Sequence, residues 1–109
     1  MTVKELMNKH IFEVINEGGQ LEREITTPFC CDLLSIAMSK APAGSAWVTV
    51  MANINTLAVA VLADASCIIL AEGVSLDEAS VAKAKEQEIT VFSSQEPIYV
   101  TAKQIDLLL

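Results

Sequence analysis

The sequence has few aromatic residues and few basic ones, and each shortage narrows what the chain can be. Its 109 residues include one Trp, one Tyr and three Phe, so the core has to be built mainly from aliphatic side chains. Seven basic residues against fourteen acidic ones give a net charge of −7. A surface of that sign repels phosphate backbones and anionic lipids, so we expect neither nucleic acid nor membrane as a partner.

Glycine, histidine and cysteine are also scarce. The four glycines form neither G-x-x-x-x-G-K-[ST] nor G-x-G-x-x-G, which argues against a P-loop nucleotide hydrolase. His10 is the only histidine, and Cys30, Cys31 and Cys67 show no C-x-x-C spacing. We therefore expect no metal site, no cofactor and no disulfide, and we interpret His10 as a solvated residue at a helix end.

No segment of the sequence has the features of a secretion signal or a membrane span. Residues 1–6 are amphipathic and charged, unlike a signal peptide. The most apolar stretch, residues 57–71, is shorter than the roughly 20 residues that a spanning helix needs, and Asp64 and Ser66 interrupt it. With an odd number of cysteines, this predicts a reduced, cytoplasmic protein.

Three consecutive strand-then-helix units fill the second half of the chain. Their strands are expected at 46–50, 67–71 and 89–92, and their helices begin near Asn53 or Asn55, at Ser75, and at Pro97. Connections of this length make parallel strand pairs with right-handed crossovers. The sequence therefore predicts a single α/β domain over residues 1–109, a small layered structure with a mainly parallel sheet flanked by helices.

The first half of the chain is expected to add two helices and a hairpin. Thr2 and Glu5 have the spacing of a capping box for a helix through about residue 9. A strand at 11–15 and a turn at 16–19 lead to an alternating segment at 21–25, which we interpret as an edge strand that Pro28 ends. Asp32 is then expected to cap a helix over 33–39.

Polar side chains follow each strand of the three units. If the strands are parallel, these residues lie on one rim of the sheet, where open parallel sheets bind ligands and where helix N-termini favour anions. The alternative is that each residue only caps its own helix. The candidate ligand-binding residues are Asn53, Asn55, Glu72, Gly73, Ser93 and Ser94.

The adjacent cysteines suggest a further alternative, a thiol-dependent enzyme that uses Cys30 or Cys31. A helix start near Asp32 would favour a thiolate, but the charge of Asp32 would oppose it and no base is placed nearby by the sequence. We interpret both residues as small buried hydrophobes, and Cys67 as an inert core residue.

The helix expected to start at Asn53 or Asn55 and to run to about residue 63 is apolar nearly all round, with Leu57, Val59, Val61 and Leu62 and alanines between. A domain of this size has little interior in which to bury every face of such a helix. The pattern therefore predicts a homo-oligomer in which a second copy covers it.

From residue 21 onward the chain resembles the DRTGG domain family. The matching segments are 21–26, 31–35 with Met38, 41–50, 58–61, 68–69 and Gly73. The resemblance implies an α/β fold similar to the N-terminal domains of HPr kinase and of Mur ligases. In place of the Asp-Arg and Gly-Gly of the family pattern, this chain has Glu22-Arg23 and Thr26-Thr27-Pro28.

Similar domains accompany CBS domains, inorganic pyrophosphatases or phosphate acetyltransferases, and the kinase activity of HPr kinase resides in a separate P-loop domain. The resemblance thus implies regulation or assembly rather than catalysis. We expect a non-catalytic regulatory or scaffolding module. Its expected partners are further copies of itself and an enzyme that it regulates. A nucleotide- or anion-binding sensor subunit is the alternative.

Overall fold

Five strands form one sheet in the order β1-β5-β4-β3-β2, and the computed structural model describes every residue of the chain. The strands are β1 (Glu13–Asn16), β2 (Pro28–Cys30), β3 (Ala46–Thr49), β4 (Cys67–Leu70) and β5 (Val91–Ser93). The helices are α1 (Val3–Asn8), α2 (Leu34–Lys40), α3 (Ile54–Leu62), α4 (Glu78–Glu86) and α5 (Ile98–Asp106).

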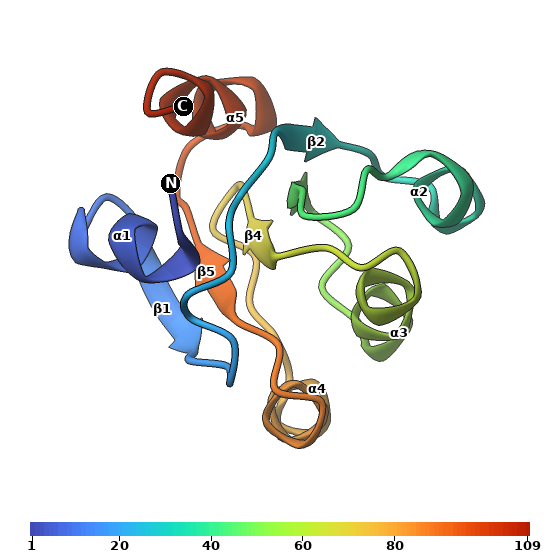
Figure 1. Ribbon diagram of the computed structural model, residues 1–109. Helices are drawn as coiled ribbons and strands as arrows, with labels where there is room; N and C mark the ends of the chain where they lie inside the picture. The colour runs from blue at the N-terminus through green and yellow to red at the C-terminus, as the bar shows by residue number, and fades with distance from the viewer.

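The strands β2 to β5 are parallel, and only β1 runs antiparallel, against β5. Helices α2, α3 and α4 cover one face of the sheet, and α1 and α5 lie on the other (Figure 1). This confirms the predicted α/β domain and the side-by-side, parallel arrangement of the last three strands. None of the helices has the length and apolar character needed to cross a bilayer.

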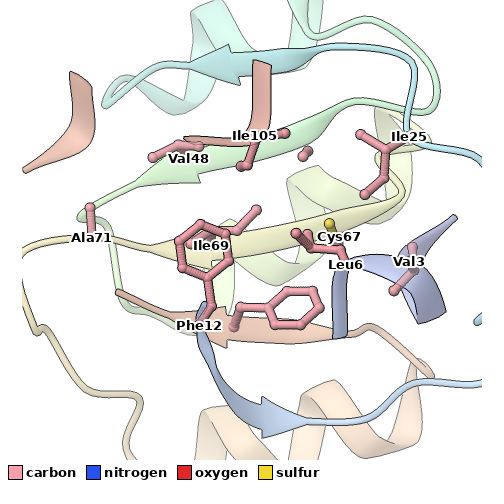
Figure 2. Close-up of a cluster of buried hydrophobic side chains, with 11 residues drawn as sticks. Val3, Leu6, Phe12, Ile25, Val48, Cys67, Ile69, Ala71 and Ile105 are labelled. Atoms are coloured by element: carbon pink, nitrogen blue, oxygen red, sulfur yellow. The ribbon is translucent and has the colours of Figure 1, made fainter. Parts of the chain in front are cut away.

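The central strands carry the core because both of their faces are buried. On the α1 and α5 side, Val48 of β3 and Ile69 of β4 pack with Leu6 and Ile105 (Figure 2). Phe92 of β5 belongs to the same cluster. The sequence neighbours of these strand residues point the other way, since side chains alternate along a strand. The alternate positions pack against α2, α3 and α4, and include Trp47, Ile68, Leu70 and Val91.

The predicted edge strand at residues 21–25 is wrong. Backbone groups of the N-terminal segment take its hydrogen bonds instead: the N–H of Val3 donates to the carbonyl of Arg23 at 3.0 Å, and that of Lys4 to Leu21 at 2.8 Å. Only a single bridge, Thr2 to Glu24, has strand geometry here. A contact between distant segments thus replaces the hairpin that local alternation predicted.

Pro28 begins a strand rather than ending one, which corrects the second expectation for this region. Strand β2 lies at the edge of the sheet, where the missing N–H of proline leaves no ladder bond unmade. The last strand also starts later than predicted, at Val91. The strand expected at 11–15 is confirmed in the form of β1.

Two predicted helix caps are wrong and two are confirmed. Leu33, not Asp32, is the N-cap residue of α2, and its side chain makes no capping bond. Asp77, not Ser75, caps α4 by accepting from the N–H of Ser80 at 2.8 Å. The capping box of Thr2 and Glu5 is present. The cap of α3 is Asn53, one of the two asparagines, Asn53 and Asn55, at which the sequence predicts the start of this helix.

Candidate functional site

The six candidate ligand-binding residues do not form a single cluster. Asn53 follows β3, as predicted, but its side chain is used within the fold. Its Oδ1 accepts hydrogen bonds from the N–H groups of Asn55 and Thr56, at 2.9 and 3.2 Å. Asn53 therefore satisfies the first turn of α3, which is the alternative that the sequence had left open.

Asn55 lies in the first turn of α3 and lines a groove between α2 and α3. Leu34 and Met38 of α2 line the groove from one side, and Ala58 and Leu62 of α3 line it from the other. The groove has a volume of about 490 Å³. Asn55 is thus a polar group in mostly apolar surroundings.

The residues after β4 and β5 hold the two loops together through their backbones. The N–H of Glu72 donates to the carbonyl of Glu96, and the N–H of Gly73 to that of Ser94, both at 2.9 Å. The hydroxyl of Ser94 is buried, and it accepts from Thr101 Oγ1 at 2.9 Å. These contacts fasten α5 to the carboxyl end of the sheet.

Gly73 and Ser93 do come together, in a hollow of about 250 Å³ that Gln95 and Glu13 also line. Gly73 has a φ of +67°, which strains any residue with a Cβ, and a Cβ here would lie 2.7 Å from Gln95 Oε1 and displace that side chain. No basic side chain lines the hollow, and Glu13 brings a negative charge. Its chemistry suits a neutral or hydrogen-bonding group better than an anion.

The cysteines differ from one another in exposure. Cys30 is exposed, contrary to prediction, Cys31 is half-buried, and Cys67 is buried as expected. Partial burial and the nearby charge of Asp32 raise the pKa of the Cys30 thiol, and burial raises the pKa of Cys67 to about 12. An activated thiol needs the opposite shift, so neither group has the electrostatics of a nucleophile.

A second polar site, which the sequence did not indicate, lies at the opposite end of the sheet. Arg23 Nη1 contacts Asp64 Oδ1 at 2.6 Å, and Arg23 Nη2 donates to the Asp64 carbonyl at 2.8 Å. This hydrogen bond lowers the pKa of Asp64 and raises that of Arg23. The pair borders a cavity of about 140 Å³, with Ser66 and Glu88 in its wall.

Metal-binding geometry is not found in the chain. No three His, Cys, Asp or Glu side chains come close enough together to hold an ion. His10 is exposed and follows Lys9, the C-cap residue of α1, with a φ of +56°.

The most unusual surface is the outer face of α2 and α3, which we call the apolar face. Helix α2 lies at the edge of the molecule, beside β2 and α3 (Figure 1). Ala37 is the only residue of α2 that is buried. Large apolar side chains are exposed on both helices: Leu33, Ile36 and Met38 on α2 and its N-cap, and Ile54, Val61 and Leu62 on α3. Met38 and Leu62 line the groove between the helices, whereas Val61 lines the cavity beside Asp64.

Charge is almost absent from the apolar face. Between Asp32 and Asp64, the only charged side chain in the sequence is Lys40, although the chain as a whole carries fourteen acidic residues. This gap was visible in the sequence. Its meaning was not, because only the packing of α2 beside α3 shows that two helices of this segment share an apolar groove at the surface.

Comparison of the chain with protein-family models and with curated proteins returns no match. The resemblance to the DRTGG family therefore stays a prediction from the sequence segments named above. Arg23 is one of those residues, and its ion pair with Asp64 fixes the start of the segment to the end of α3.

Proposed function

We propose that the chain is a non-catalytic regulatory or scaffolding module that works as a homo-oligomer and self-associates through the apolar face of α2 and α3. All three cysteines are free, which supports a cytoplasmic setting in which thiols stay reduced. The use of polar side chains within the fold supports the non-catalytic part of the proposal. Asn53, Ser94 and Asp77 are all engaged in hydrogen bonds that hold the fold together.

The observation that carries the proposal is the poor burial of α2. A helix of seven residues is unstable in water unless tertiary packing supports it. This helix buries only Ala37, and it has no side-chain cap at its start. Its apolar residues Leu33, Ile36 and Met38 are exposed in the single chain. Packing against a second molecule supplies the burial that the chain itself does not.

A second copy is the occupant that the charge distribution favours. Two molecules of charge −7 repel each other over most of their surfaces, but much less where the surface carries no carboxylate. A stable interface buries about 800 Å² on each partner, which is about a seventh of the chain's accessible surface of 5582 Å². Two adjacent helices with exposed apolar side chains and an apolar groove between them offer a surface suited to that purpose.

Sedimentation velocity across micromolar concentrations tests the proposal. We expect the native chain to sediment as a dimer or larger assembly, and Leu62→Glu to shift it to monomer, because the interface would have to bury an unpaired charge. Leu107→Glu is the matched control. Leu107 is 76% exposed and Leu62 is 71% exposed, and each ends a helix. A monomeric native chain, or equal effects of the two substitutions, contradicts the proposal.

A further inference from the structure

The exposed side of α2 has an apolar centre and one charged residue at each end. Leu33, Ile36 and Lys40 follow one another at spacings of three and four residues, which places them on one side of the helix. Asp32, just before the helix, and Lys40, at its end, are equally far from Ile36 in the sequence. Their charges are opposite.

We infer that two copies pair across a two-fold axis beside Ile36, with α2 antiparallel to the α2 of the second copy, so that each Lys40 meets the other copy's Asp32. This inference rests on the proposed self-association and specifies its geometry. In such an isologous interface every contact occurs twice. The two ion pairs would lie at the ends of an apolar strip centred on Ile36.

Both charges are available for this pairing. Asp32 Oδ1 accepts both internal hydrogen bonds, from Thr49 Oγ1 at 2.6 Å and from the N–H of Val50 at 3.0 Å, and Oδ2 accepts none. The three ion pairs of the chain involve neither Asp32 nor Lys40. Those hydrogen bonds also fix the position of the Asp32 carboxylate before any partner arrives, which reduces the entropy lost on pairing.

The neighbouring sheet edge does not compete for the second copy. Strand β2 is short, Pro28 has no N–H to offer, and the carbonyl of Pro28 already accepts from Thr27 Oγ1 at 3.0 Å. These features block the edge against addition of another strand. Cys30 also lies on the other side of the sheet, since its neighbours Phe29 and Cys31 pack with the cluster around Trp47.

Charge reversal at the end of α2 tests the inference. Sedimentation equilibrium on the full chain is expected to show that Lys40→Glu raises the dimer Kd about tenfold or more, because two attractive pairs become repulsive. Lys103→Glu is the matched control: it also reverses a basic residue in the last turn of a helix and changes the net charge equally. We expect its Kd to stay within about twofold of the native value.

The outcomes separate the two proposals. A native chain that dimerises with the same Kd in both variants overturns the two-fold geometry but leaves self-association standing. A native chain that stays monomeric overturns both. Circular dichroism of each variant shows whether it remains folded.

Labelling of the native thiol of Cys30 is a second test of the two-fold geometry. We expect maleimide labelling of Cys30, followed by mass spectrometry, to proceed at the same rate above and below the dimer Kd, because Cys30 faces away from the apolar face. Protection of Cys30 in the dimer would instead place the interface at β2 and overturn the inference.

Discussion

Helices α2 and α4 lie on the same face of the sheet and bury almost nothing of themselves, yet their surfaces are opposites. Helix α4 buries only Ser80 and Ala84. It begins with a carboxylate cap and carries a Lys83–Glu86 ion pair. Helix α2 buries only Ala37, has no side-chain cap, and is surrounded by exposed apolar residues.

The comparison shows that a poorly buried helix can have either a polar or an apolar exposed surface in this fold. Helix α4 is suited to water, because acidic residues lie in its first turn and basic residues in its last turn, where they complement the helix dipole. Helix α2 has one such residue, Lys40, and otherwise a surface that water solvates poorly. The first helix is an outer layer, and we propose that the second is half of an interface.

Trp47→Phe is expected to have the largest effect, because α2 is held through this residue rather than through a cap. Trp47 is fully buried, and its Nε1 donates to the carbonyl of Cys31 at 3.0 Å, just before α2 begins. Loss of this bond and of ring volume is expected to lower the free energy of unfolding by about 2–4 kcal/mol.

Urea unfolding followed by circular dichroism measures this loss. Tyr99→Phe, at an exposed aromatic residue, is the control and is expected to change stability by less than about 0.5 kcal/mol. A loss below about 1 kcal/mol for Trp47→Phe would show that α2 is fastened by other contacts.

Exchanging the caps of the two helices is expected to have intermediate effects of opposite sign. Asp77→Ala removes the cap of α4 and should lower the free energy of unfolding by about 1 kcal/mol. Leu33→Ser adds a capping hydroxyl to α2 and should stabilise the single chain by about 0.5–1 kcal/mol, while weakening self-association. Chemical unfolding and sedimentation measure the two quantities, and stronger association of Leu33→Ser would contradict the contrast.

Acidification is expected to give the smallest effect of those that distinguish α4 from α2, through the cap of α4. The hydrogen bond from the backbone N–H of Ser80 lowers the pKa of Asp77 below its ordinary value. The cap therefore stabilises α4 fully above the ordinary pKa of aspartate, about 4, and its contribution is lost as the pH falls through the lowered value.

Amide chemical shifts recorded by NMR from pH 5 to 2 measure this titration. The shift of the Ser80 amide should move with a midpoint below 3.8, the ordinary value for Asp77. Asp77→Asn keeps a capping oxygen and should abolish the titration. No carboxylate caps α2, so an equal midpoint at the amides of its first turn would count against the contrast between the helices.

The central part of the fold could be predicted from the sequence because its signals are local. The runs at 46–50 and 67–71 are apolar except for Thr49, as expected of strands buried on both faces, and they contain β3 and β4. The capping box at Thr2 and the cap at Asn53 also depend only on neighbours within three residues. Patterns of this range are legible without a structure.

The errors arose where distant segments decide the outcome. Residues 21–25 alternate like a strand, but the backbone of the N-terminal segment occupies their hydrogen bonds. Asp32 stands where a cap belongs, yet it binds Thr49 and Val50 instead, from across the sheet. Likewise, the candidate ligand-binding residues do not form one cluster. The surroundings of Asn55 depend on how α2 packs beside α3, which no local pattern encodes.

The two aspartates that border the uncharged segment have a role before folding is complete. Between Asp32 and Asp64 the nascent or unfolded chain has a single charge and several β-prone apolar runs, the composition that drives intermolecular aggregation. We expect the carboxylates at its two ends to oppose this aggregation. After folding, the same two groups hold β2 to β3 and α3 to the Arg23 segment, so replacing either one would impair both solubility during synthesis and the finished structure.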